Sequence, residues 1–104
     1  MTDVLQAFAG WYARQCDGDW EHSHGIRITT LDNPGWRLDI NVSGTEREGF
    51  SFEAVREERD ELDWIHAWKE QEIFKVACGP LNLAEALQRF LDWVHDSADR
   101  PPPE

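Results

Sequence analysis

Apolar residues recur every three or four positions near both ends of the chain, which is the period of a helix with one buried face. The first stripe consists of Val4, Leu5, Phe8, Trp11, Tyr12 and Cys16. It predicts a helix that ends at Asp17-Gly18. The second stripe consists of Leu83, Leu87, Phe90, Leu91 and Val94. Asn82 precedes it, with Glu85 three residues on, and this spacing predicts a cap whose side chains satisfy free backbone amides.

Between the two helices the apolar residues alternate with polar ones, which is the period of a strand. The alternation covers residues 26–31 and 36–43. Between these strands lies Asp32-Asn33-Pro34-Gly35, where Pro34 fixes φ and Gly35 supplies the positive φ of a type II turn. The pattern therefore predicts a hairpin, and Ser43-Gly44-Thr45 should turn the chain again.

Further strands are expected in the second half of the chain. One begins at Phe50, Phe52 and Ala54 and runs into a charged far end at residues 56–61. A second hairpin is expected from residues 64–69 and 73–78 around Glu70-Gln71. Its first strand places Trp64, His66 and Trp68 on one side and Ile65 and Ala67 on the other.

This order of elements predicts an α+β fold. We expect an antiparallel meander sheet of four or five strands, with an N-terminal and a C-terminal helix packed on one face. Residues 1–96 should form a single domain, and residues 97–104 should be a disordered tail because they end in Arg100-Pro101-Pro102-Pro103. The other face of the sheet stays available, and six tryptophans are more than a small core readily hides.

Charge and cysteine content narrow the range of partners. The chain has 21 acidic and 10 basic residues, a formal net charge of −11, which disfavours nucleic acid and anionic lipid as partners and favours a basic protein. No apolar run approaches the roughly 20 residues of a membrane span, and no secretion signal is evident. We therefore expect a cytoplasmic protein in which Cys16 and Cys78 are free thiols.

The acidity is concentrated between Glu46 and Asp63, a stretch that contains eight carboxylates and only three arginines. Clustered negative charge speeds the encounter with a basic partner, and neighbouring tryptophans can anchor the complex. A solvated strand edge would also explain the charges, and nothing singles out a catalytic acid/base pair. The predicted partner-binding residues are Glu53, Glu57, Glu58, Asp60, Glu61, Asp63, Trp64 and Trp68.

The segment from Cys16 to His24 holds the densest group of reactive side chains. Cys16, His22 and His24 are suitable zinc ligands, although their spacing matches no standard metal signature. A histidine could also activate Cys16 as a nucleophile, although no glycine-rich oxyanion turn accompanies it. The simplest interpretation is structural: the aspartates cap a turn, Trp20 fills the core, and no metal or cofactor is bound.

Several blocks of this chain resemble one protein family. The most specific residues are Trp11, Cys16, Asp17, Gly18, Asp19, Trp20, Glu21 and His22, followed by Asp32, Asn33, Pro34, Gly35 and Trp36. Later blocks are Glu58-Arg59, Asp63-Trp64-Ile65-His66 and Gly79-Pro80-Leu81-Asn82-Leu83. Together they resemble immunity protein 53 of bacterial polymorphic toxin systems over nearly the whole chain except its tail. Cys78 stands where the resemblance leads us to expect a glycine.

The resemblance implies a non-enzymatic cytoplasmic protein that binds and inactivates a toxin encoded beside it. Together with the charge, it predicts a basic toxin, with a nuclease as the expected class. Two other functions stay open at this point. One is a small metal- or thiol-dependent enzyme that uses Cys16, His22 and His24, and the other is a generic acidic adaptor whose partner is no toxin.

Overall fold

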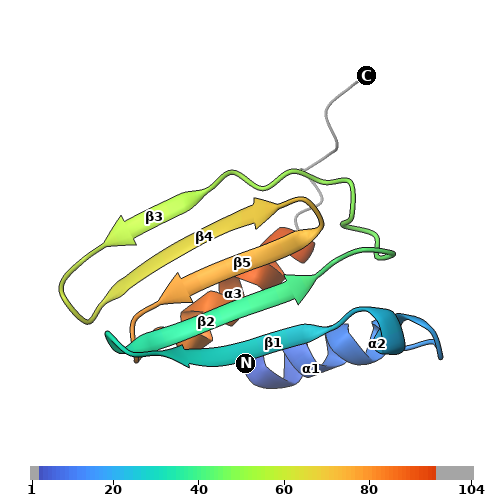
Figure 1. Cartoon of the computed structure of the whole chain (residues 1–104), viewed down its shortest axis with the longest axis horizontal. Helices are drawn as coiled ribbons and strands as arrows, with labels where there is room; N and C mark the ends of the chain where they lie inside the picture. Colours follow the sequence, from blue (N-terminus) through green and yellow to red (C-terminus); the bar gives the residue numbers. More distant parts are fainter. Residues whose placement is uncertain (1–2, 96–104) are drawn as a thin grey trace.

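In the computed structural model the chain forms a five-stranded antiparallel sheet with helices on one of its faces (Figure 1). The structure describes residues 3–95, so the predicted tail at 97–104 lies outside it. The helices are α1 (Val4–Gln15), α2 (Trp20–Ser23) and α3 (Leu83–Val94). The strands are β1 (Ile26–Leu31), β2 (Gly35–Asn41), β3 (Val55–Glu58), β4 (Trp64–Glu70) and β5 (Ile73–Cys78). The predicted α+β class is confirmed.

The strands lie side by side in the order β1-β2-β5-β4-β3, and every neighbouring pair is antiparallel. The sheet thus combines the β1-β2 hairpin with a three-stranded meander of β3, β4 and β5. The strand beside β2 is β5, with Trp36 opposite Cys78, and β3 occupies the far edge. The charged β3 is thereby exposed as an edge strand, a position where charge discourages pairing with other chains.

The core lies between the sheet and the two long helices. Trp11 of α1 packs edge-on against Phe90 of α3, with 4.8 Å between ring centroids, and Phe90 in turn lies 5.1 Å from Phe74 of β5. The inward residues of the central strands, among them Leu38, Ile40, Ile65, Phe74 and Val76, are fully buried. Because these strands alternate, their other residues form the opposite face of the sheet, which none of the helices α1, α2 and α3 covers (Figure 1).

The stripe predicted for α1 is only partly buried. Phe8 and Trp11 lie in the core, but Leu5 is 63% exposed and Tyr12 is 40% exposed. Only one flank of the helix contacts α3 and the sheet, so its apolar stripe is wider than the surface it covers. The stripe predicted for α3 packs against the core along its whole length, where it is joined by Ala86 and Trp93.

The third strand was predicted too early in the chain. It begins at Val55, whereas residues 50–54 are irregular. Phe52 still reaches the core and lies 4.6 Å from Phe74. The carbonyl of Ser51 accepts a hydrogen bond from the indole of Trp93 at 2.9 Å, so this backbone group is satisfied by a side chain. The apolar alternation at residues 50–54 therefore reflects packing onto α3.

Two turn predictions were wrong in mechanism. Gly35 lacks the positive φ that a type II turn requires and instead starts β2, where a Cβ would lie 2.2 Å from the carbonyl oxygen of Cys78. Its small size matters for close packing. Asn82 does precede α3, but its side chain makes no capping bond to the helix amides. Gly44, with φ of 75°, and the β4-β5 hairpin match the predictions.

Candidate functional site

The eight predicted partner-binding residues do not form one surface, because strand alternation sends them to different sides of the sheet. Trp64, Trp68 and Glu58 belong to the uncovered face, since each alternates with an inward residue of β4 or β3. Asp60 and Glu61 lie in the turn between these strands. Of the other three residues, Glu57 of β3 and Asp63 at the end of the turn pair with Arg59, and Glu53 precedes β3.

The turn and the uncovered face together border an open hollow of about 420 Å³. Its lining residues are Asn33, Glu58, Asp60, Glu61, Trp64 and His66. Nε2 of His66 lies 2.9 Å from Oε2 of Glu58. This hydrogen bond, followed by the charge of Arg56, lowers the pKa of Glu58. The hollow thus joins three carboxylates to an indole and an imidazole.

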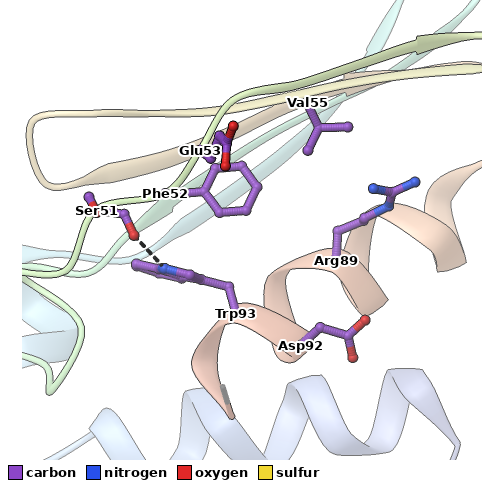
Figure 2. Close-up of a pocket in the computed structure, with 7 residues that line it drawn as sticks. All are labelled: Ser51, Phe52, Glu53, Val55, Arg89, Asp92 and Trp93. Carbon is purple, nitrogen blue, oxygen red and sulfur yellow. Dashed lines mark hydrogen bonds between the residues drawn. The ribbon is translucent and has the colours of Figure 1, made fainter. Parts of the chain in front are cut away.

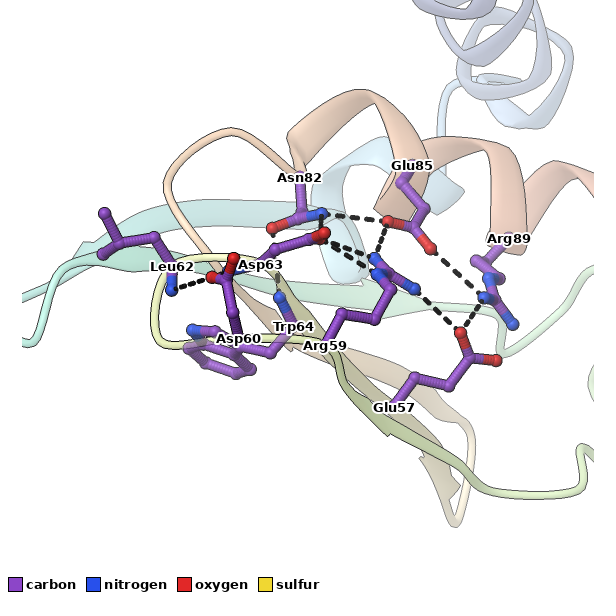
Figure 3. Close-up of polar contacts among 9 residues, drawn as sticks. All are labelled: Glu57, Arg59, Asp60, Leu62, Asp63, Trp64, Asn82, Glu85 and Arg89. Atoms are coloured by element: carbon purple, nitrogen blue, oxygen red, sulfur yellow. Dashed lines mark hydrogen bonds and ion pairs between the residues drawn. The ribbon is translucent and has the colours of Figure 1, made fainter.

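Glu57 and Asp63 face α3, where an ion-pair network holds them (Figure 3). The guanidinium of Arg59 lies 2.8 Å from Glu57, 2.9 Å from Asp63 and 2.6 Å from Glu85. Arg89 completes the network with Glu57 at 3.0 Å and Glu85 at 3.1 Å. The hydrogen bond from Arg59 lowers the pKa of Asp63. These carboxylates therefore fasten β3 and its turn to α3.

Further hydrogen bonds fix the shape of the β3-β4 turn (Figure 3). Asp60 Oδ1 accepts from the amides of Leu62 at 2.8 Å and Asp63 at 3.0 Å. The side chain of Asn82 donates to Asp63 at 3.0 Å and accepts from the amide of Trp64 at 3.4 Å. The turn is consequently tied both to itself and to the start of α3.

The residues of this network were missed by the sequence analysis. Arg59, Asn82, Glu85 and Arg89 were not predicted to act together, and Asn82 with Glu85 was interpreted as a local cap. The side chain of Asn82 does donate to Glu85, at 3.0 Å, but its oxygen is used across the turn. The spacing of Asn82 and Glu85 was the only signal present, and it did not reveal the distant partners.

Glu53 lies in a separate hollow of about 480 Å³ between residues 51–55 and α3 (Figure 2). Phe52, Val55 and Trp93 supply apolar walls, and Glu53, Arg89 and Asp92 supply charged groups. Trp68 also lies apart from the turn, on the uncovered face, where the guanidinium of Arg37 sits 5.9 Å from its ring centroid. Asp39 pairs with Arg37 at 3.2 Å. Neither Glu53 nor Trp68 lines the hollow at the β3-β4 turn.

In the segment from Cys16 to His24, side chains bind the backbone of the segment itself and a tryptophan anchors it in the core. Asp17 Oδ1 accepts from the amides of Asp19 and Trp20 at 2.9 and 3.0 Å, and Glu21 accepts from those of Asp17 and Gly18 at 2.9 and 2.8 Å. Trp20 is only 6% exposed, as its predicted core role requires. Its indole donates to the carbonyl of Ser43 at 2.7 Å.

Cys16, His22 and His24 do not come together as a metal or nucleophile site would require. Within residues 3–95 no three side chains of His, Cys, Asp or Glu converge on a point that could hold a metal ion. The thiol of Cys16 donates to the carbonyl of Tyr12 at 3.4 Å, and the ring of His24 lies 6.1 Å from that of Trp20. Both cysteines are free thiols.

The second specific block, from Asp32 to Trp36, lies at the same end of the sheet as the β3-β4 turn (Figure 1). Asn33 lines the hollow with Trp64. The indole of Trp36 donates to the carbonyl of Pro80 at 3.0 Å, which joins the β1-β2 hairpin to the segment before α3. Three connections, 32–34, 59–63 and 79–82, therefore meet at this end.

Comparison with known proteins identifies the family. The family model described as immunity protein 53 matches residues 5–95, which is most of the chain. No curated protein and no solved structure matches. None of the helices in the described part is long and apolar enough to cross a membrane. The family description supports an immunity role, which implies binding to a cognate toxin, and such proteins are generally not enzymes. This chain belongs to the immunity protein 53 family.

Proposed function

We propose that this protein neutralises a basic toxin, with a nuclease as the expected class, by binding it in the cytoplasm through an acidic and aromatic surface. That surface is the acidic hollow, defined by Asn33, Glu58, Asp60, Glu61, Trp64 and His66. The observation that carries the proposal is the presence of three carboxylates and a half-buried indole in the lining of one concave site.

The chemistry of the acidic hollow suits a cationic side chain. Carboxylates accept charge-assisted hydrogen bonds from lysine or arginine, and an indole ring attracts a cation placed over its face. Enzymes that act on nucleic acid place such cations where phosphate groups bind. A protein that occupies those cations with carboxylates would compete with the phosphates, and so inhibit the toxin without any catalytic step.

Charge also favours this surface kinetically. The chain carries a net charge of −11, so it attracts a basic partner before contact. Glu61 is exposed, and the Glu58 side chain stays 55% exposed although it pairs with Arg56 and His66, whereas Glu57 and Asp63 are held by Arg59. We therefore propose a smaller interface than the eight residues expected from the sequence, centred on Glu58, Asp60, Glu61 and Trp64.

A charge-reversal experiment tests the choice of surface. Glu58→Lys combined with Glu61→Lys should slow association with the toxin by about tenfold or more and flatten its dependence on salt. Asp60 is left intact because it holds the turn. The toxin is the one captured from the source bacterium whose growth arrest this protein reverses, and stopped-flow mixing at several salt concentrations measures the rate.

The matched control is Glu46→Lys combined with Glu72→Lys, because both residues are exposed and lie outside the acidic hollow. This pair changes the net charge by the same amount. If both pairs slow association equally, net charge alone guides the toxin and the proposed surface is wrong. Selective slowing by the first pair, with weaker rescue of growth, supports it.

A further inference from the structure

Five large apolar side chains of the described residues are exposed, and two of them have no explanation in the fold. Leu5, Tyr12 and Ile28 continue the periodic stripes of α1 and β1 at the margin of the core. Leu62 and Leu81 lie in connections, where no periodicity demands an apolar residue. They are 53% and 91% exposed. Single exposed leucines are ordinary, so their relative placement decides whether these two matter.

The connections that carry Leu62 and Leu81 lie against each other. A Cβ on Gly79 would come within 2.3 Å of the carbonyl oxygen of Leu62, so only glycine permits this approach. At the same junction, Asn82 bonds to Asp63 and to the amide of Trp64. Leu62 and Leu81 therefore project from two backbones that are packed together at one end of the sheet.

This junction is also continuous with the acidic hollow. Leu62 follows Asp60 and Glu61 directly, and the turn that carries it is held by hydrogen bonds to Asp60 (Figure 3). A partner that contacts the hollow would meet a fixed apolar projection beside it. The backbone that carries Leu62 is already held by these hydrogen bonds, so little backbone freedom is lost on binding, which favours affinity.

We propose that Leu62 and Leu81 are the apolar anchors of the toxin complex and insert into an apolar recess that basic side chains surround on the toxin. This inference rests on the proposed function and assigns separate roles in association and dissociation to two groups of residues. The carboxylates of the acidic hollow guide association, and the two leucines hold the complex by excluding water at its centre.

Charge identifies the toxin, and not a second copy of this chain, as the occupant. In a symmetric dimer built on this end of the sheet, Asp60 and Glu61 of one copy would face the same carboxylates of the other. Like charges brought together in an interface oppose association. A basic partner turns the same carboxylates into favourable contacts.

The test separates dissociation from association. Leu62→Ala combined with Leu81→Ala should raise the dissociation rate of the toxin complex by about tenfold or more and change the association rate by less than about twofold. The matched control is Leu5→Ala, which truncates a leucine of similar exposure on α1. It should leave both rates unchanged. Surface plasmon resonance with the captured toxin measures both rates.

The outcomes distinguish this inference from the proposed function. An unchanged dissociation rate in the double variant overturns the anchor role, while slower association in the Glu58→Lys, Glu61→Lys variant would leave the proposed function standing. A wild-type dimer that the leucine substitutions abolish, seen by light scattering, would assign these residues to self-association and also overturn the inference. If the double variant loses structure, Leu81→Gln alone provides the test, because that side chain is 91% exposed.

Discussion

Two acid-rich turns of this protein place similar residues in different surroundings. In the segment from Asp17 to Glu21, both Asp17 and Glu21 bind backbone amides of the segment itself, and Trp20 between them is buried. In the turn from Asp60 to Asp63, the two aspartates fasten the backbone, but Glu61 and Leu62 between them remain exposed. The tryptophan that follows this turn, Trp64, is only half-buried.

The difference teaches that the density of reactive side chains in a sequence does not show which of them remain free to contact a partner. The first turn has the richer composition, with a cysteine and two histidines nearby. Its carboxylates are already occupied by amides, which lower the pKa of Asp17 through hydrogen bonds from Trp20 and Asp19. The second turn keeps side chains that can still form contacts with a partner.

The largest expected effects come from replacing the tryptophan of each turn, Trp20 or Trp64, with alanine. Trp20→Ala should destabilise the protein by about 3–5 kcal/mol, because it removes a buried ring and leaves a cavity. Trp20 packs edge-on against Trp11, with 6.1 Å between ring centroids, and donates to Ser43 at 2.7 Å. Denaturant unfolding monitored by circular dichroism measures the loss.

The paired variant is Trp64→Ala. It should lower the free energy of unfolding less than Trp20→Ala does, and it should weaken toxin binding more. Trp64 is half-buried and its ring lines the acidic hollow. If the two variants lose equal stability, or if Trp64→Ala still binds the captured toxin as tightly as wild type, the division into a structural and a functional turn does not hold.

A smaller effect separates carboxylates within the second turn by their pH dependence. Hydrogen bonds from Arg59 and Asn82 lower the pKa of Asp63 in the folded state. A carboxylate with a lowered pKa contributes stability that is fully present above its unfolded pKa, about 3.9. That contribution is lost as the pH falls through the folded pKa. Asp63→Asn should therefore be less stable than wild type at pH 7, and the difference should shrink below about pH 4.

Glu61→Gln is the control for this pH dependence, because Glu61 forms no hydrogen bond or ion pair with another residue of the range 3–95. Its free energy of unfolding should follow the wild-type curve from pH 7 to pH 3. Equal curves for Asp63→Asn and Glu61→Gln would show that the ion-pair network contributes nothing measurable. Urea unfolding at each pH provides the comparison.

The sequence pattern predicted most elements of the fold because each depends on local periodicity. The α3 stripe, the β4-β5 hairpin and the two-sided β4 strand all follow from residues a few positions apart. The place of β5 beside β2 depends on pairs such as Trp36 and Cys78, and no local pattern encodes that register. The same limit explains why the start of β3 was misplaced. Phe52 has the alternating position of a strand residue and packs against the core, although residues 50–54 form no strand.

The candidate site was predictable only in outline. Charge and aromatic content indicated the region from Glu53 to Trp68, but not which carboxylates are occupied. That distinction depends on Arg59 and Glu85, which are 26 residues apart and meet only after α3 packs against the sheet. Leu62 and Leu81 were not predicted at all, because an exposed leucine in a turn carries no signal in a single sequence.

The smallest expected effect tests the thiol-dependent alternative. Cys16→Ser should leave toxin neutralisation and stability close to wild type, because the serine hydroxyl can replace the thiol as donor to the carbonyl of Tyr12, now 3.4 Å from the sulfur. Growth rescue and the toxin affinity are the measurements, with Glu58→Lys, Glu61→Lys as the variant that should fail. If Cys16→Ser abolished rescue while the protein stayed folded and still bound toxin, the segment from Cys16 to His24 would have a chemical role. The contrast between the two acid-rich turns would then be reversed.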